Sequence, residues 1–170
     1  GYENADNAGS DGFELEFKAM HTKGFATVNY SFYTQAYRPV PESYSIPGHE
    51  NSALALPQHK IGVNLNYMPV KNIHIGPSLV YFGKKYGYVG VDEEYNATVG
   101  EMGPDYLVNL TLTYENMFRN GFSLSLSAFD LLNQKPVFIQ PYNGWFYPYP
   151  GRSREILVKL ILTSDLIKKK

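Results

Sequence analysis

The sequence contains no cysteine, which excludes a disulfide framework, a thiolate nucleophile and a metal site built from cysteine. It also lacks any apolar run of about 18 residues, the length from which a transmembrane helix is recognised. Charged residues are sparse, at 18%, and the formal net charge is -1. Such a chain has no bulk electrostatic attraction to nucleic acid, which is therefore not an expected partner. The first residues show neither the basic nor the apolar region of a signal peptide.

Aromatic residues are what the sequence has in excess, with 15 tyrosines and 10 phenylalanines among 170 residues. Tyrosine suits a boundary between apolar and wet surroundings, because its ring is apolar and its hydroxyl forms hydrogen bonds. The mean hydropathy is negative, as in soluble proteins. Membrane-spanning β-strands also average to such values, since lipid-facing and lumen-facing residues alternate along them. The composition therefore allows a membrane barrel as well as a soluble domain.

Apolar residues recur at every second position in several segments, the pattern of a β-strand with one apolar face. In the first segment, Leu15 and Phe17 alternate with Glu14 and Glu16. The segments predicted as strands are 12–20, 25–37, 58–67, 73–82, 106–114, 122–129 and 152–162. Pro77 weakens the fourth, because proline donates no hydrogen bond to a sheet. The last segment also fits an amphipathic helix, although its β-branched residues favour a strand.

The connections between these segments are alternately short and long. Short connections follow the first, third and fifth segments, and the one at His21–Gly24 is tight enough for a hairpin. The long connections span 38–57, 83–105 and 130–151. This alternation places all short turns at one end of a sheet and all long loops at the other. An eighth strand would have to lie at 86–91 or within 137–147.

Three features favour a membrane barrel over a soluble sandwich or lipocalin, which would also need an apolar strand face. The polar faces carry mostly Asn, Thr, Ser and Gly, which suit a hydrated or plugged lumen. Segments of about 9–13 residues are long enough to cross the hydrocarbon when tilted. Aromatic residues also gather near the segment ends, as in interfacial girdles. The expected rows are Phe25, Tyr67, Tyr114 and Phe122 at the short turns, and Phe13, Tyr37, Tyr81, Tyr106 and Phe129 at the long loops.

We therefore predict an all-β chain, an antiparallel meander of about seven strands (or eight) that forms part of a transmembrane β-barrel. A complete bacterial barrel has an even strand number and both termini in the periplasm. Seven strands that end on the short-turn side must start on the extracellular side, so we expect the C-terminal portion of a larger barrel. The expected organisation is an extracellular loop remnant at 1–11, barrel strands at 12–162 and a polar, basic tail at 163–170.

The C-terminal part, AFDLLNQKPVFIQPYNGWFYPYPGRSREILVKLIL, resembles the close of a TonB-dependent outer-membrane receptor. In that family the penultimate strand ends in a motif like Asp130–Lys135 of this chain. An aromatic loop, a P-G-R sequence like Pro150–Arg152 and a final strand follow. The paired segments around Gly24 are also similar to the family. One departure is that the chain continues beyond Leu162 to three lysines, whereas the family usually ends on an aromatic residue.

The resemblance implies active uptake of a nutrient (a siderophore, cobalamin, carbohydrate or peptide) across the bacterial outer membrane. The implied partners are outer-membrane lipid, an N-terminal plug with the rest of the barrel, the TonB complex reached through that portion, and the nutrient. The alternative is a self-contained small β-barrel that binds an apolar ligand or has a structural or adhesive role. A soluble all-β adhesion module is a further possibility.

The sequence shows no catalytic constellation, no cofactor motif and no metal-ligand spacing among its four histidines, so neither an enzyme nor a cofactor- or metal-binding protein is expected. The candidate ligand-binding residues are aromatic residues of two long loops, where exposed rings can stack on a flat or apolar ligand. They are Tyr142, Trp145, Phe146, Tyr147 and Tyr149 in the last long loop, and Tyr86 and Tyr88 in the loop before it. Packing of these rings on each other, which would make the loops rigid, is an equally open interpretation.

Overall fold

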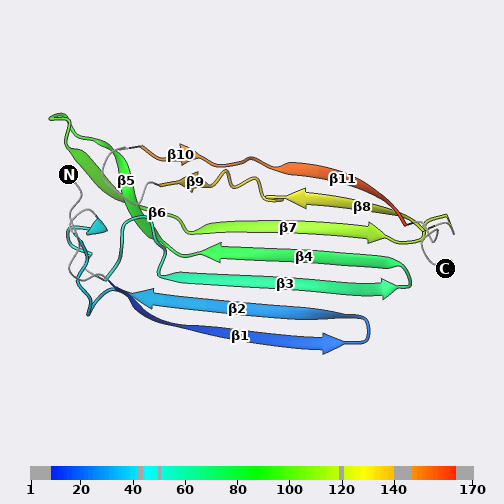
Figure 1. The fold of residues 1–170 in the computed structure, drawn as a ribbon. Coiled ribbons are helices and arrows are strands. Elements are labelled where there is room, and N and C mark those ends of the chain that lie inside the picture. The colour runs from blue at the N-terminus through cyan, green and yellow to red at the C-terminus, as the bar shows by residue number, and fades with distance from the viewer. Residues whose placement is uncertain (1–8, 42–43, 50, 119–120, 140–146, 164–170) are drawn as a thin grey trace, which may run out of the picture.

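Seven strands form one antiparallel sheet in the order β1-β2-β3-β4-β7-β8-β11 in the computed structural model (Figure 1). The structure describes residues 9–41, 44–49, 51–118, 121–139 and 147–163. The sheet strands are β1 (Asp11–His21), β2 (Gly24–Thr34), β3 (His59–Val70), β4 (Ile73–Phe82), β7 (Asp105–Tyr114), β8 (Phe122–Phe129) and β11 (Glu155–Leu162). The predicted all-β fold and seven-stranded meander are confirmed. The helix considered for the last segment is wrong over Glu155–Leu162, which is a strand.

In the described parts of the long connections, four further strands lie outside the main sheet. β5 (Lys85–Val91) and β6 (Ala97–Met102) pair as a hairpin between β4 and β7. β9 (Val137–Phe138) and β10 (Tyr149–Pro150) form a two-residue pair between β8 and β11. Of the two places considered for an eighth strand, 86–91 lies in β5, and 137–147 contains the two-residue β9, with 140–146 outside the described residues. Neither β5 nor β9 extends the seven-stranded sheet.

The short turns all lie at one end of the sheet and the long connections at the other (Figure 1). The β3–β4 turn is shorter than predicted, because β3 continues to Val70, which pairs with Ile73. Asn72 takes the left-handed conformation that this tight turn requires, with φ of 68°. The β1–β2 turn requires Gly24, since a Cβ atom there would collide with the backbone oxygen of Asn66.

One face of the sheet is apolar across all seven strands, because paired positions of an antiparallel sheet share a face. One row across β1 to β7 contains Phe17, Val28, Val63, Leu79 and Val108. A second row, across β7, β8 and β11, contains Leu112, Leu126 and Val158. Pro77 is accommodated on this face opposite Leu110. The alternation read from the sequence thus becomes one continuous apolar surface.

The opposite face is polar and is held together by hydrogen bonds between small side chains. Thr111 Oγ1 and Ser127 Oγ are 2.9 Å apart, and Thr113 Oγ1 and Ser125 Oγ are 3.0 Å apart. Asn109 donates from Nδ2 to Ser78 Oγ at 3.2 Å. The two serines are buried, with exposed fractions of 8–9%. These cross-strand bonds explain why small polar residues, rather than long charged ones, occupy this part of the face.

Aromatic rings cluster on the apolar face near the long connections. The centroids of Phe13 and Tyr30 are 5.7 Å apart, and those of Tyr81 and Tyr106 are 5.2 Å apart. Tyr67, Tyr114 and Phe122 share the apolar face near the short turns. Three members of the predicted rows lie elsewhere: Phe25 and Phe129 face the polar side, opposite Asn66 and Glu155, and Tyr37 lies in the β2–β3 connection. Both rows exist, but with fewer members than expected.

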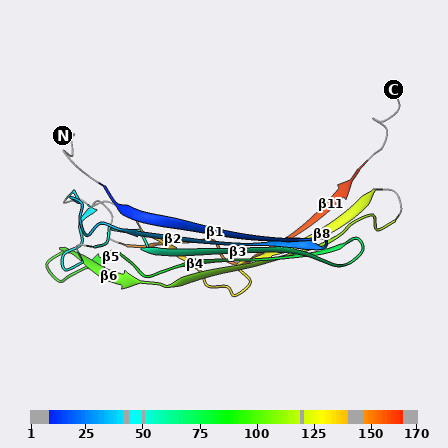
Figure 2. The same ribbon diagram turned by 90° about the horizontal axis from the view of Figure 1, so that it is seen from below.

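Within the part of the chain that the structure describes, the sheet has no covered core. Among the described residues, the almost fully buried apolar side chains are Ile46, Ala53 and Leu54, all in the β2–β3 connection rather than in the sheet. β1 and β11 form the two edges and do not pair with each other, so the described strands form a twisted, open layer (Figure 2). No helix among the described residues is long and apolar enough to cross a membrane.

Candidate functional site

The candidate site lies at the end of the sheet that carries the long connections (Figure 1). Three connections meet the sheet there: β2–β3, β4–β7 with the β5–β6 hairpin, and β8–β11. Loops carried by a rigid sheet are the usual location of binding residues, because the sheet fixes their bases and leaves their chemistry free to vary.

The β2–β3 connection has a small core of its own. Ile46 and Leu54 are 1–2% exposed, and Leu54 N donates to the Tyr44 carbonyl at 3.1 Å. The Tyr33 hydroxyl, from β2, donates to the Leu56 carbonyl at 2.7 Å. At the other side, the Arg38 guanidinium forms a two-pronged bond with the Asp11 carboxylate of β1. The connection is therefore a folded element fixed to the sheet edge rather than a loose loop.

Tyr86 of β5 joins this element to the β5–β6 hairpin. Its ring stacks on the His49 ring, with centroids 3.9 Å apart, and its carbonyl accepts a hydrogen bond from Ala55 N at 2.6 Å. Its hydroxyl donates to Glu101 Oε2 at 3.3 Å. Burial, together with the charge of Glu101, raises the pKa of the Tyr86 hydroxyl, so this group stays protonated at neutral pH.

Two ion pairs hold the base of the hairpin. Lys84 Nζ lies 2.7 Å from Glu101 Oε1, and Lys85 Nζ lies 2.6 Å from Asp105 Oδ2 at the start of β7. The second pair is mostly shielded from solvent, with side-chain exposures of 12% and 18%. The hydrogen bond from Lys84 lowers the pKa of the Glu101 carboxyl, and the same bond raises the pKa of Lys84. The hairpin is thus anchored by charge at its base.

A cavity of about 490 Å³ lies between the β2–β3 connection and the hairpin. Tyr86 and His49 line it, together with Asn51 and Ser52 from the connection and Lys84 before β5. Its lining combines aromatic rings with amide, hydroxyl and imidazole groups. Among the described residues, no three His, Asp or Glu side chains are grouped to hold a metal ion.

The predicted aromatic residues fall into three groups. Tyr86 lines the cavity, and Tyr88 lies two residues further along β5. Tyr147 lies beside the same hairpin, because a Cβ atom added at Gly90 would be 3.7 Å from the ring of Tyr147. Tyr149 is in β10. Tyr142, Trp145 and Phe146 lie outside the described residues. The two loops chosen from the sequence are therefore neighbours, which is also shown by the close approach of Ile139 to Gly87.

His49, Lys84 and Glu101 belong to the site but were not singled out from the sequence. His49 was considered only as a metal ligand, and its actual partner is an aromatic ring. Its contact with Tyr86 joins two loops that are distant along the chain, and no local pattern encodes such a contact. The one available signal was that Lys84, Tyr86 and Glu101 all lie in a Gly- and Tyr-rich long connection.

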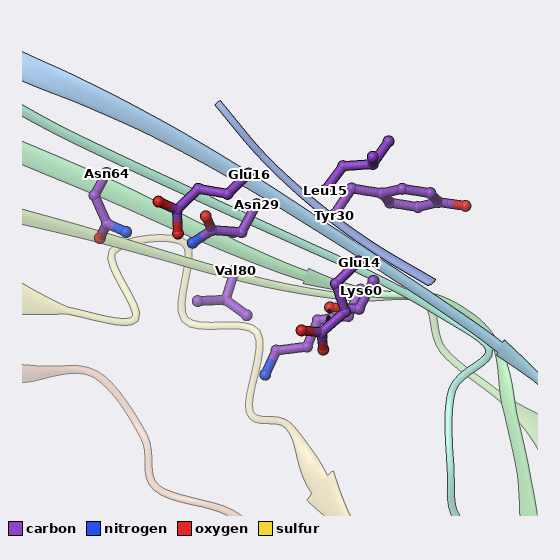
Figure 3. Close-up of a pocket in the computed structure, with 10 residues that line it drawn as sticks. Glu14, Leu15, Glu16, Asn29, Tyr30, Lys60, Asn64 and Val80 are labelled. Carbon is purple, nitrogen blue, oxygen red and sulfur yellow. Dashed lines mark hydrogen bonds between the residues drawn. The ribbon is translucent and has the colours of Figure 1, made fainter. Parts of the chain in front are cut away.

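A second cavity, of about 510 Å³, lies on the polar face of the sheet. Glu14, Glu16, Asn29, Lys60 and Asn64 point to this side, whereas Leu15 and Tyr30 point to the opposite side (Figure 3). Ser31 Oγ donates to the Glu14 carboxylate at 3.4 Å. The Asn29 Oδ1 atom is buried and has no hydrogen-bond partner among the described residues. This polar surface is suited to contact with water or with another polar segment rather than with lipid.

No protein-family model matches the chain, and no curated protein matches it. A chain in the solved structure of the FpvAI–pyocin S2 complex shares its fold, with a TM-score of 0.67 over 88% of this chain and 13% sequence identity. That neighbour, FpvA, is a TonB-dependent receptor. The match covers 18% of the FpvA chain, so the present chain spans less than a fifth of the protein it resembles. At this identity the likeness establishes a shared fold.

Proposed function

We propose that this chain forms part of the barrel wall and the extracellular loops of a TonB-dependent receptor that takes up a nutrient across the bacterial outer membrane. The observation that carries the proposal is the uncovered apolar face, which runs across all seven strands and includes side chains as exposed as Phe17 (66%), Val158 (62%) and Leu160 (63%). A soluble domain would leave this surface in water at a large cost in free energy. In a bilayer, the same surface faces hydrocarbon.

Two further observations support the same proposal. Short turns at one end of the sheet and long connections at the other match the periplasmic and extracellular sides of outer-membrane barrels. The likeness to FpvA, of which the chain matches a part, supports a wall segment of a larger barrel. The open edges of β1 and β11 would then pair with neighbouring strands, as sheet edges in a bilayer must.

In this role the chain supplies structure and binding rather than catalysis. The polar face with Glu14, Asn29 and Lys60 would line the lumen, and the connection around Tyr86 would meet ligands outside the cell. Energy for uptake would come from the TonB complex through other parts of the receptor. FpvAI binds a pyocin in the solved complex, and a protein or a small nutrient are both suited to the loops of the present chain.

Single-cysteine labelling tests the proposed orientation cleanly, because the chain contains no cysteine of its own. The full-length protein that carries the chain is produced in Gram-negative cells with Tyr95→Cys, in the β5–β6 turn, or Lys71→Cys, in the β3–β4 turn. Tyr95 is 83% exposed. We expect a membrane-impermeant maleimide to label the Tyr95 variant on intact cells, and the Lys71 variant only after the outer membrane is opened.

A matched pair inside β3 tests the lipid-facing assignment. Val63→Cys on the apolar face should resist the maleimide in isolated outer membranes, and Asn64→Cys on the polar face should react. Equal labelling of both turns on intact cells, or recovery of the protein in the soluble fraction, would contradict the proposal. The small-barrel and adhesion alternatives predict no difference between the two turns.

A further inference from the structure

The 510 Å³ cavity on the polar face adjoins a second cavity of about 690 Å³, which lies nearer to the long connections. Glu14, Ser31 and Lys60 line both cavities. By register these three residues form one row across β1, β2 and β3. The two cavities therefore form a single space, which we call the polar groove. Under the proposed function, the polar groove lies on the lumen side of the barrel wall.

Glu14 and Lys60 bring opposite charges to the polar groove without pairing with each other. Both side chains point to the same side of the sheet (Figure 3). The Glu14 carboxylate accepts a hydrogen bond from Ser31 Oγ at 3.4 Å, and Lys60 Nζ lies 5.5 Å from the centre of the Phe82 ring. The ion pairs found among the described residues include neither Glu14 nor Lys60, and they do not include Glu16 either. Both kinds of charge thus remain available to a ligand.

The spacing of these charges fits a short zwitterion. Glu14 and Lys60 lie two strands apart, and because neighbouring strands are separated by about 4.8 Å, their backbones are roughly 10 Å apart. An extended peptide spans about 3.3–3.6 Å per residue, so roughly two or three residues reach from one charge to the other. A neutral sugar would leave both charges without a partner, and a simple cation would be opposed by Lys60.

The space between the charges also suits a peptide. Gly62 follows Lys60 on the same face of β3 and leaves a hollow there, because it has no side chain. The Nδ2 atom of Asn29 borders this hollow, 3.8 Å from the position that a Cβ atom of Gly62 would take. An amide side chain donates and accepts hydrogen bonds, as a peptide bond does. In the second cavity, Phe82 and Leu56 offer apolar groups to a peptide side chain.

We propose that the polar groove binds peptides of two or three residues, with the amino terminus at Glu14 and Glu16 and the carboxyl terminus at Lys60. The inference rests on the proposed function and narrows its nutrient to a short, zwitterionic peptide. Glu16 contributes because it follows Glu14 on the same face of β1 and lines the 510 Å³ cavity.

Calorimetric titration of the purified full-length protein with the tripeptide alanyl-phenylalanyl-alanine tests the inference. We expect the tripeptide to bind, and its N-acetylated and C-amidated forms to bind roughly tenfold or more weakly, the effect of losing one charge-assisted hydrogen bond. Lys60→Met should no longer distinguish the tripeptide from its amide. Glu14→Gln/Glu16→Gln should no longer distinguish it from the acetylated form. Each pair of changes thus assigns one terminus to one side of the groove.

Two further variants separate loss of the site from loss of the fold. Gly62→Val fills the hollow and keeps all charges, and a Cβ atom there makes only ordinary contacts with Asn29, at 3.8–3.9 Å. This variant should fold and lose tripeptide binding. Lys159→Met is the matched control, because Lys159 lies on the polar face of β11, opposite Ser125 and outside both cavities. It should bind the tripeptide with the affinity of the wild type.

Several outcomes would overturn the inference. Equal affinity for the tripeptide and its amide would show a site for the ammonium group alone, and equal affinity for the acetylated form a site for the carboxylate alone. No binding of the tripeptide, or unchanged binding by Gly62→Val, would also overturn it. A protein that shows the expected labelling of Tyr95→Cys and Lys71→Cys but does not bind the tripeptide refutes this inference alone. Failure of the labelling experiment refutes the proposed function.

Discussion

The ring of His49 lies stacked on the ring of Tyr86, with centroids 3.9 Å apart and ring planes inclined by 24°. The two residues belong to different connections, and the bond from Ala55 N to the Tyr86 carbonyl reinforces the contact. Because Ile46 and Leu54 form a small core behind it, the β2–β3 connection and the β5–β6 hairpin form one packed unit. A ligand that meets one of them therefore meets a surface already shaped by the other.

Removing the Tyr86 ring should loosen this unit. Tyr86→Ala deletes the stack on His49, and aromatic pairs contribute about 0.5–1.5 kcal/mol. We expect amide hydrogen exchange of the β2–β3 connection, measured by mass spectrometry, to become roughly two- to tenfold faster. Tyr86→Phe keeps the ring and loses only the bond to Glu101, so its exchange should stay close to the wild type. Equal acceleration in both variants would show that the hydroxyl, not the stack, holds the unit.

The Lys84–Glu101 pair should make the packing of the hairpin dependent on pH at both extremes. The pKa of Glu101 is lowered by Lys84 from 4.5, so its contribution is present above that value and is lost as pH falls through the folded-state pKa. The pKa of Lys84 is raised by Glu101 from 10.5, so its contribution is present below that value and is lost as pH rises through the folded-state pKa. The rate of proteolysis of the hairpin should therefore be low, and independent of pH, between the ordinary pKa values of 4.5 for glutamate and 10.5 for lysine.

The substitution Glu101→Gln isolates the acid limb of this dependence. Without the carboxylate, cleavage of the hairpin by an acid-active protease should no longer change as pH falls below about 4.5, the ordinary glutamate value. Glu93→Gln, in the β5–β6 turn, is the matched control and should retain the wild-type profile. An unchanged acid limb in Glu101→Gln would assign the dependence to a different group.

Arginine substitutions on neighbouring residues of β11 should distinguish lipid from water on the two faces. Val158 lies on the apolar face and Leu157 on the opposite face, with exposed fractions of 62% and 51%. In a bilayer, Val158→Arg should lower the free energy of unfolding by about 2–4 kcal/mol, the cost of arginine near the midplane of a barrel wall. Leu157→Arg should cost less. Urea titration of the full-length protein in vesicles, followed by gel mobility, measures both.

This pair has an outcome that excludes the membrane proposal. In water, two surface positions of similar exposure respond alike to arginine, and each substitution would change stability by about 0.5 kcal/mol or less. Similar, small effects for Val158→Arg and Leu157→Arg would therefore indicate that both faces are wet.

Asp130 should be necessary for the bend after β8. It is 5% exposed, adopts a φ of 48°, and accepts hydrogen bonds from Gln134 N at 2.9 Å and Lys135 N at 3.4 Å. Asp130→Ala would leave these amides without partners, and we expect a loss of about 1–3 kcal/mol in the free energy of unfolding. Asp130→Asn retains one acceptor and tolerates the left-handed backbone, so its loss should be smaller. Thermal unfolding of both variants measures the difference.

Much of the sheet is encoded locally. The alternation of residues such as Leu15 with Glu14 predicts a strand with one apolar face, and all seven strands are found within a few residues of their predicted ends. β2 ends at Thr34 rather than at residue 37, where the backbone turns toward Arg38 and its bond with Asp11. Pro77 fits within β4 despite its missing donor, because its neighbours on both sides maintain the register.

The site was only partly predictable. The aromatic residues Tyr86 and Tyr147 stood out because rings are unusual in long polar loops, and both lie at the β5–β6 hairpin. His49 and Glu101 did not stand out, since an isolated histidine or glutamate carries no pattern of its own. Phe25 and Phe129 were placed in the aromatic rows because they lie near the ends of their strands. Side chains alternate between the two faces of a strand, and the strand pairing puts these two on the polar face.

By itself the sequence determined the strands, the apolar and polar faces of the sheet, and the division into an end with short turns and an end with long connections. Each of these depends on residues that are close along the chain. Period-two alternation acts within one strand, and turn length acts between two neighbouring strands. Only the tertiary structure decided that the sheet stays open, that its apolar face is uncovered, and that the β2–β3 connection carries a core of its own. These properties depend on contacts such as His49 with Tyr86, which form only when distant segments are brought together by the sheet.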